Sequence, residues 1–256
     1  MKVAILAGGF GSRLAEETVI RPKPMVEIGG YPILWHIMRH YSYYDFREFV
    51  IALGYKGEYI KKYFADYCSL AGDLSLDFTT RRITTNGDVE LGWTVRLVET
   101  GIQTNTGGRI KRLSDHVGDQ TFMLTWGDGV SNINLRSLLD FHRSHGKLAT
   151  LTAVRPPARY GHLDLVGNKV IRFSEKPQAS EGWINGAFFV LEPEVLNYID
   201  GDDTQFEKEP LERLAKDGQL MAFQHESFWQ CMDTLREKHI LETLWESDRA
   251  PWKIWS

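Results

Sequence analysis

A short apolar run that passes directly into glycines constrains the fold of this chain most. Residues 3–7 are all apolar, and Gly8, Gly9 and Gly11 follow almost at once. Continuous apolar runs of this length are typical of strands that are buried on both faces of a sheet. Glycines after such a strand permit a tight turn and let backbone N–H groups approach an anion closely. The start of the chain therefore predicts a buried strand that ends at a phosphate-binding loop or, on the glycines alone, a tight turn that binds nothing.

The rest of the chain alternates strand-like and helix-like patterns. Strands are expected at residues 49–53, 122–126, 148–154, 170–173 and 183–191. Helices are expected at residues 33–41, around residues 59–64, after Pro193 and at residues 210–216. A further helix is expected to begin at Asn134, its N-cap, and to end at Gly146. The last expected helix follows Thr234, which forms a capping box with Glu237. This alternation predicts an α/β fold with a largely parallel sheet that is covered on both faces.

Composition excludes several classes of protein. The 30 Lys and Arg residues against 34 Asp and Glu residues give a net charge of −4, so no basic excess favours binding to nucleic acid. No apolar stretch approaches the roughly 18 residues of a membrane span, and the first apolar run is too short for the core of a signal peptide. Cys68 and Cys231 lack metal-ligand spacing and indicate reduced thiols. We therefore expect a soluble, cytoplasmic protein that binds neither nucleic acid nor membrane.

Two cations near the glycines favour the phosphate-binding interpretation. Arg13 follows the glycines directly, and Lys23 stands between Pro22 and Pro24, which exclude a helix there. An arginine can bind two phosphate oxygens at once, and the lysine supplies a second positive charge. We expect Lys23 to face solvent, so that its removal would not unfold the protein. Leu14 occupies the place of the third glycine of the dinucleotide-binding fingerprint, which disfavours a nicotinamide-dependent dehydrogenase.

Two aspartates are candidate metal ligands. Asp128 lies between two glycines at the end of an expected strand, and Asp233 precedes the last expected helix. The carboxyl edge of an α/β sheet is where ligands bind, and Mg²⁺ prefers a few carboxylates together with phosphate oxygens. The alternatives are a turn residue for Asp128 and a helix-entry anion for Asp233.

The motifs resemble those of one enzyme family along nearly the whole chain. They are LAGGFGSRL and RPKPMVEIGGYPIL, then Thr106 to Arg109, Trp126 to Gly129, Tyr160-Gly161, Glu175 to Pro177, Ile184 to Gly186, and Trp229 to Thr234. This set is similar to that of the sugar-phosphate nucleotidyltransferases, the NDP-sugar pyrophosphorylases. Within the family it most resembles the glucose-1-phosphate cytidylyltransferases. Trp126, Ala187 and Cys231 depart from the tyrosine, glycine and proline of the family pattern.

The resemblance implies a fold, a reaction and a cofactor. The fold would be a three-layer, Rossmann-like α/β fold with a mostly parallel mixed sheet. Residues 1–256 would form a single domain, with a nucleotide-binding half at about 1–150 and a sugar-phosphate-binding half with the C-terminal helix at 151–256. CTP and α-D-glucose 1-phosphate would give CDP-glucose and diphosphate in the presence of Mg²⁺. Such products feed deoxysugar synthesis for the lipopolysaccharide O antigen.

The resemblance also implies roles for individual residues. Catalytic roles fall on Arg13, Lys23 and Asp128, and Mg²⁺ would be held by Asp128 and Asp233. The nucleotide-binding set is Leu6, Ala7, Gly8, Gly9, Gly11, Ser12, Arg13, Lys23, Thr104, Arg109 and Asp128. The sugar-phosphate set is Gly161, Glu175, Lys176 and Asn185.

Two other interpretations within this resemblance remain open. One is a different pyrophosphorylase, such as a mannose-1-phosphate guanylyltransferase. The other is a non-catalytic regulatory relative that binds sugar nucleotides, whose usual mark is the loss of Arg13, Lys23 or an aspartate. All of these are present here. Residues 80–93 are rich in turn-forming residues, and we expect a lid or an intersubunit arm there and a homo-oligomeric protein.

Overall fold

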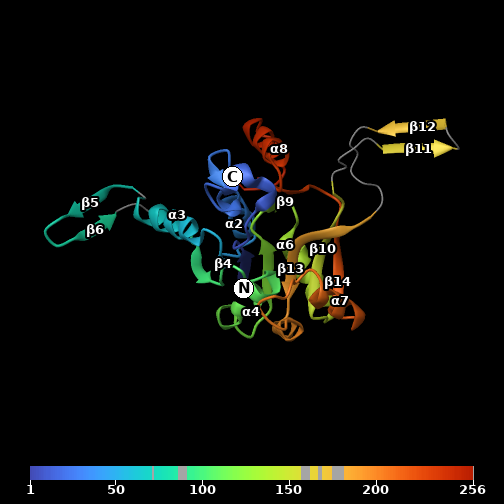
Figure 1. Ribbon diagram of the computed structural model, residues 1–256, viewed down its shortest axis with the longest axis horizontal. Helices are drawn as coiled ribbons and strands as arrows, with labels where there is room; N and C mark the ends of the chain where they lie inside the picture. Colours follow the sequence, from blue (N-terminus) through green and yellow to red (C-terminus); the bar gives the residue numbers. More distant parts are fainter. Residues whose placement is uncertain (71, 86–90, 157–161, 167–168, 175–181, 256) are drawn as a thin grey trace.

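A seven-stranded sheet forms the centre of the computed structural model (Figure 1). The structure describes residues 1–70, 72–85, 91–156, 162–166, 169–174 and 182–255. In spatial order the strands of this sheet are β14 (Leu220–His225), β10 (Ala149–Val154), β13 (Ile184–Leu191), β8 (Phe122–Trp126), β1 (Lys2–Leu6), β4 (Glu48–Leu53) and β7 (Thr94–Glu99). Only β13 runs antiparallel to its neighbours, and the other four strand pairs are parallel. The predicted mixed, mostly parallel α/β sheet is confirmed.

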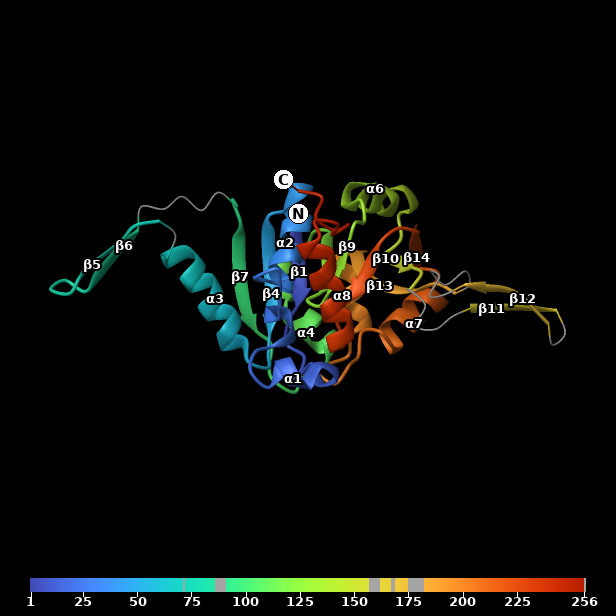
Figure 2. The same ribbon diagram turned by 90° about the horizontal axis from the view of Figure 1, so that it is seen from above.

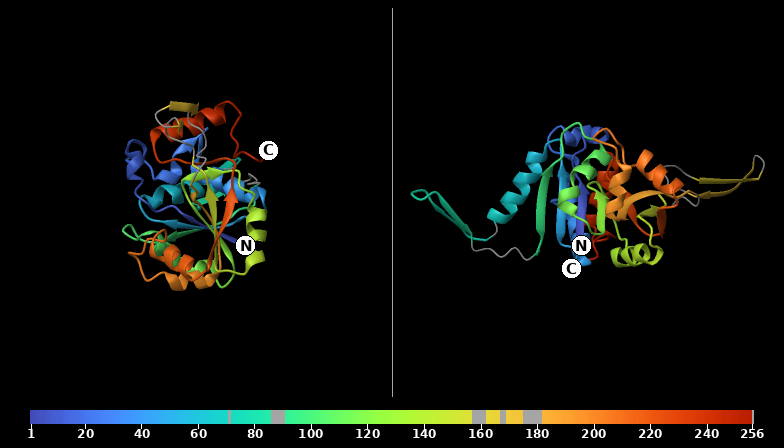
Figure 3. Two further views of the ribbon diagram at one scale, coloured as in Figure 1. Left: turned by 90° about the vertical axis from the view of Figure 1, so that its right-hand side faces the viewer. Right: turned by 90° about the horizontal axis from the view of Figure 1, so that it is seen from below.

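Alternate residues of the central strands enter two separate cores. Val3 and Ile5 of β1 belong to the core on one face, whereas Ala4 and Leu6 belong to the core on the other. The first core contains residues of α2 (Ile33–Tyr43), α3 (Gly57–Ser69), α6 (Leu135–His145) and α8 (Leu235–Glu246). The second contains residues of α4 (Thr106–Arg112), α5 (Ser114–Val117) and α7 (Glu209–Lys216). Because successive side chains of a strand point to opposite faces, helices on both faces make the three layers seen in Figure 3.

Helix ends follow the sequence signals closely. Asn134 accepts a hydrogen bond from the Ser137 N–H at 3.0 Å at the start of α6, and Gly146 ends the helix at φ +63°. Thr234 and Glu237 form the complete capping box of α8. The helix expected after Pro193 is instead a 3-10 helix, η3 (Pro193–Tyr198). The described helices include none that is both long and apolar enough to cross a membrane.

The sequence patterns do not predict two strands of the central sheet, β7 and β14. These are the two edge strands, and no residue of either is fully buried. An edge strand with partly exposed faces lacks the continuous apolar run that marks a buried strand, so the hydrophobic pattern carries little signal.

Two hairpins extend from opposite ends of the sheet, as Figure 2 shows. One pairs β5 (Leu74–Asp77) with β6 (Arg82–Thr85), and the other pairs β11 (His162–Val166) with β12 (Lys169–Ser174). The first hairpin includes part of the turn-rich segment at 80–93, of which residues 86–90 lie outside the described residues. The role of that segment as a lid or intersubunit arm stays a prediction.

Several short elements lie outside the central sheet and the main helices. They are η1 (Ser12–Leu14), α1 (Ala15–Thr18), η2 (Lys23–Met25), β2 (Glu27–Ile28), β3 (Tyr31–Pro32), β9 (Gly129–Ser131) and β15 (Trp229–Cys231). The aromatic tail of the chain packs onto α2, where the Trp252 Nε1–H donates to His36 Nδ1 at 3.3 Å. Trp252 and Trp255 are buried members of the core on this face of the sheet.

The buried histidines of α2 should make the fold sensitive to acid. Burial lowers the pKa of His36 and of His40 from 6.5 to about 4. Between pH 6.5 and about pH 4, these histidines bind protons in the unfolded chain but not in the native protein. The free energy of unfolding therefore falls as the pH decreases through this range. From pH 7.5 to pH 5, each histidine should remove about 2 kcal/mol from the free energy of unfolding. Urea unfolding at both pH values tests this, and equal stabilities would contradict it. The His40→Gln variant should have a lower free energy of unfolding than the wild type at pH 7.5, but that free energy should change less between pH 7.5 and pH 5.

Candidate active site

A pocket of about 360 Å³ opens at the carboxyl edge of the sheet, beside the end of β1. The chain continues from β1 to β4 on one side, whereas β8 lies on the other side of β1. Ligands of open α/β sheets bind outside the strand ends at such a change in direction of the strand order. The topology therefore places the pocket where this architecture binds small molecules.

All residues predicted to bind the nucleotide or the metal line this one pocket. They are Leu6, Ala7, Gly8, Gly9, Gly11, Ser12, Arg13, Lys23, Thr104, Arg109, Asp128 and Asp233. They come from five segments: the loop after β1, the segment around η2, the loop after β7 with the adjoining α4, the end of β8, and the start of α8. The sequence does not reveal that these five segments are neighbours.

Further lining residues were not among the predicted site residues. Phe10, Ile102, Gln103 and Asn105 also line the pocket. The last three belong to the loop that follows β7. Since the sequence does not predict β7, it does not indicate that the loop after it reaches the carboxyl edge. A correct assignment of that edge strand would have pointed to this loop.

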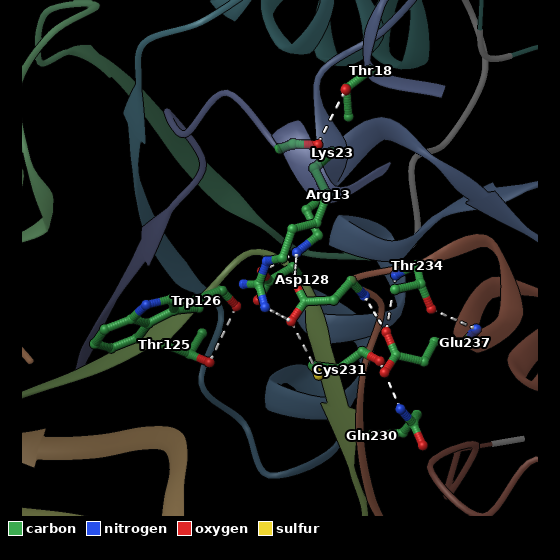
Figure 4. A network of polar contacts seen from close by, with 12 residues as sticks. Arg13, Thr18, Lys23, Thr125, Trp126, Asp128, Gln230, Cys231, Thr234 and Glu237 are labelled. Carbon is green, nitrogen blue, oxygen red and sulfur yellow. Dashed lines mark hydrogen bonds and ion pairs between the residues drawn. The ribbon is translucent and has the colours of Figure 1, made fainter. Parts of the chain in front are cut away.

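Lys23 is bound between the two predicted metal ligands, Asp128 and Asp233. Figure 4 shows the polar network around it, with Arg13, Lys23 and Asp128 labelled. Its Nζ donates to Asp128 Oδ2 at 2.6 Å and to Asp233 Oδ1 at 2.5 Å. Arg13 forms an ion pair with the other oxygen of Asp233 at 2.7 Å. The expectation that Lys23 faces solvent is wrong, because only 8% of the residue is exposed. The proline-flanked η2 turns the lysine inward to a pair of carboxylates, a contact that a local sequence pattern cannot reveal.

The charges around Lys23 keep it protonated. Burial by itself would lower the pKa of Lys23, but the charges and hydrogen bonds of Asp128 and Asp233 outweigh burial and raise it. The carboxylates also raise the pKa of Cys231, where burial comes first and the charges of Asp233, Glu237 and Asp128 add to it, to about 12. The thiol therefore stays protonated, with its sulfur 3.7 Å from Asp233 Oδ2. A neutral cysteine is compatible with the place where the family pattern has proline.

A small sheet brings the two aspartates together across a long stretch of sequence. β15 pairs with β9, so that Cys231 lies opposite Gly129, and the Met232 N–H donates to the Asp128 carbonyl at 2.8 Å. At the start of α8, Glu237 Oε2 accepts from the backbone N–H groups of Asp233 and Thr234 at 2.7 and 2.9 Å. The capping box thus fixes the backbone of a pocket carboxylate as well as ending a helix.

The donor set fits a magnesium ion. Asp128 and Asp233 already direct one oxygen each to a single cation, the Lys23 ammonium. Mg²⁺ needs only one or two carboxylates when phosphates and waters complete its shell. Among the described residues, one group of three side chains also has metal-ligand spacing, Cys231, Asp233 and Glu237. A protonated thiol and a carboxylate engaged in helix capping are poorer ligands for a hard cation.

The predicted sugar-phosphate residues are only partly described. Gly161, Glu175 and Lys176 lie outside the described residues. Asn185 lies on β13, where its Oδ1 accepts from the Ala187 N–H at 2.8 Å, and it is not among the residues that line the pocket. That hydrogen bond supports Ala187 at φ +60°, a conformation that favours the glycine of the family pattern.

Sequence and structure comparisons decide the family. Residues 2–242 match the nucleotidyl transferase family. The chain belongs to this family. It is 51% identical to the glucose-1-phosphate cytidylyltransferase of Salmonella typhi over 256 residues, which cover 100% of both chains. It is 30% identical to the mannose-1-phosphate guanyltransferase of Aspergillus oryzae (strain ATCC 42149 / RIB 40) over 94% of this chain and 62% of that protein.

A solved structure shares the fold of this family member. The inositol-1-phosphate CTP transferase from T. maritima superposes with a TM-score of 0.66 at 15% identity, over 100% of this chain and 98% of that one. At this low identity the match supports the Rossmann-like architecture alone.

Proposed function

We propose that this nucleotidyl transferase is a glucose-1-phosphate cytidylyltransferase, which converts CTP and α-D-glucose 1-phosphate into CDP-glucose and diphosphate. The observation that carries the proposal is the 51% identity to an enzyme of that name over the full length of both chains. The match to a guanyltransferase is weaker at 30% and spans only 62% of that protein. This difference favours the cytidylyl over the guanylyl interpretation.

The pocket supplies what an in-line displacement needs. A phosphate oxygen of the sugar phosphate would attack the α-phosphorus of CTP, and the bond to the leaving diphosphate would break. The attacking oxygen is already ionised near neutral pH, so catalysis reduces to positioning and neutralisation of charge. Lys23 and Arg13 would neutralise phosphate oxygens, and Asp128 and Asp233 would hold Mg²⁺. When bound, the ion would neutralise further phosphate charge. The glycine loop would supply backbone N–H donors.

The regulatory, non-catalytic alternative is less well supported. A relative that only binds sugar nucleotides would not need both carboxylates and both cations. Here Arg13, Lys23, Asp128 and Asp233 form one network in the pocket. On the acceptor side, contacts of Gly161, Glu175, Lys176 and Asn185 with the sugar phosphate remain part of the proposal and rest on the family resemblance.

We also propose a homo-oligomer in the cytoplasm. An isolated two-stranded hairpin is marginally stable in water, and the β5–β6 hairpin exposes Leu76 and, at its turn, Phe78. Contact with another subunit would cover these side chains. Both cysteines are free, which suits a reducing compartment.

The enzyme should prefer CTP to UTP by at least about tenfold in kcat/KM. Cytosine carries a donor amine at N4 and an acceptor at N3, whereas uracil has an acceptor at O4 and a donor at N3. A pocket matched to cytosine leaves polar groups unpaired when UTP enters, at a cost of about 1–3 kcal/mol each. Purines should react more slowly still, because the pocket is small. The base would be recognised by the backbone at residues 6–8 and by side chains at residues 104–109.

Release of diphosphate measures this preference directly. Initial rates with each common nucleoside triphosphate and glucose 1-phosphate, with and without Mg²⁺, test both the proposed reaction and the proposed ion. A preference for UTP, dTTP or GTP would overturn the cytidylyl proposal and leave a different pyrophosphorylase. No turnover with any nucleotide would favour the regulatory alternative.

A further inference from the structure

Arg109 differs from the other cations of the pocket because it contacts only neutral oxygen atoms. It lies on α4 with 4% of the residue exposed. Its Nη1 donates to the carbonyls of Leu53 and Gly101 at 3.0 and 2.7 Å, and to Thr100 Oγ1 at 2.8 Å. Its Nη2 donates to the carbonyls of Gly8 and Ile102 at 3.0 and 3.3 Å. Among the ion pairs of the described residues, none includes Arg109.

These contacts join the ends of three adjacent strands. Gly8 follows β1, Leu53 ends β4, and residues 100–102 follow β7. Two glycines make room for the guanidinium. A Cβ on Gly8 would lie 2.3 Å from Nη1, and a Cβ on Gly54 would lie 2.4 Å from the same atom. The loops at this edge of the sheet are therefore built around the buried arginine.

The contact with Gly8 fixes the orientation of one peptide group. The Gly8 carbonyl accepts from Arg109 and also from the Tyr55 N–H at 3.0 Å. In a planar trans peptide, the following N–H points to the side opposite the carbonyl. The Gly9 N–H is thus directed away from Arg109, and no hydrogen bond among the described residues uses it. Gly9 lines the pocket, and a Cβ there would meet nothing within 4 Å.

We propose that Arg109 is a positioning residue, which holds the Gly8–Gly9 peptide so that the Gly9 N–H donates to a phosphate of the bound nucleotide. This inference rests on the proposed nucleotidyl transfer and deepens it. It differs from the direct nucleotide contact that the family resemblance implies for Arg109, because Nη1 and Nη2 already donate to backbone carbonyls and to Thr100 Oγ1.

Arg109→Lys tests this role, because lysine keeps the charge but cannot span the same set of carbonyls. The matched control is Arg112→Lys, one turn along α4, where the arginine forms an exposed ion pair with Asp202. Calorimetric titrations should measure binding of inorganic pyrophosphate, CTP and cytidine, each in Mg²⁺. We expect Arg109→Lys to weaken the binding of pyrophosphate and CTP by about tenfold or more. Cytidine should bind within about twofold of wild type, and the control should match wild type throughout.

Two patterns would overturn the inference. If cytidine loses as much affinity as CTP, Arg109 contacts the base directly. If all three ligands bind as in wild type, Arg109 does not position the loop. Should Arg109→Lys fail to fold, Gly8→Ala replaces it, since the added Cβ must displace the guanidinium or the loop, and it should show the same selective loss.

The wild-type titrations separate this inference from the proposed function. If the wild-type protein binds pyrophosphate but does not use CTP, the cytidylyl proposal fails while the pyrophosphate comparison still tests Arg109. If the wild type uses CTP and the variant binds pyrophosphate normally, only the positioning role fails.

Discussion

Lys23→Met should lower kcat/KM by about 30- to 1,000-fold, which corresponds to about 2–4 kcal/mol of lost transition-state stabilisation. Two anionic substrates must meet in the pocket, and the variant lacks a cation that lies between two pocket carboxylates. Steady-state rates of diphosphate release measure the loss. Lys61→Met is a matched control, because Lys61 of α3 forms an exposed ion pair with Glu99 of β7. Near-normal turnover of Lys23→Met would remove this lysine from the mechanism.

The same variant should also be less stable. Without the ammonium group, the carboxylates of Asp128 and Asp233 would face one another, and among the described residues Arg13 is the cation that remains paired with them. The side chain of Asp233 is 11% exposed and that of Asp128 is 27% exposed. The loss of stability should therefore lie between the loss from breaking an exposed ion pair and the loss from breaking a buried one. We expect a loss of about 1–4 kcal/mol in the free energy of unfolding.

Mg²⁺ should restore part of the stability of Lys23→Met. In the wild type the ammonium already pairs with both carboxylates, so added Mg²⁺ should raise the Tm of the variant more than that of the wild type. Thermal unfolding with and without Mg²⁺, with no nucleotide present, checks this without any measurement of activity. An equal response of the two proteins would argue that the carboxylates do not form a cation site.

Asp128→Asn and Asp233→Asn should each lower kcat/KM by roughly 30- to 1,000-fold, but the double variant should lose far less than the product of the two effects. Both carboxylates bind the same lysine and are proposed to hold the same ion, so the first substitution already disrupts what the second would remove. Asp202→Asn, at the exposed ion pair with Arg112, serves as the control. Two effects that multiply cleanly would mean that the aspartates have separate roles.

Local patterns in the sequence predicted the elements whose signals lie within a few residues. The first buried strand, the N-cap of α6 and the capping box of α8 all stand where the pattern indicates them. The motif residues of the nucleotide and metal sides also line one pocket. These predictions hold because burial on both faces and satisfaction of helix ends impose residue types at short, regular spacings. The edge strands β7 and β14 were not predicted, because partial exposure removes that constraint.

The environment of each site residue was decided by the tertiary structure. Lys23 looked like a solvent-facing loop residue, but two carboxylates 105 and 210 positions further along the chain bind it in a buried site. Asp128 and Asp233 become neighbours only through the pairing of β9 with β15. Arg109 lies in a recognisable motif, yet its donors reach backbone carbonyls from the ends of three strands. The sequence by itself determined the α/β architecture and the chemical groups of the site, because periodic burial and motif composition are local properties. Which charges neutralise one another and which donors stay available for a ligand depend on contacts between distant segments, and only the folded chain creates those contacts.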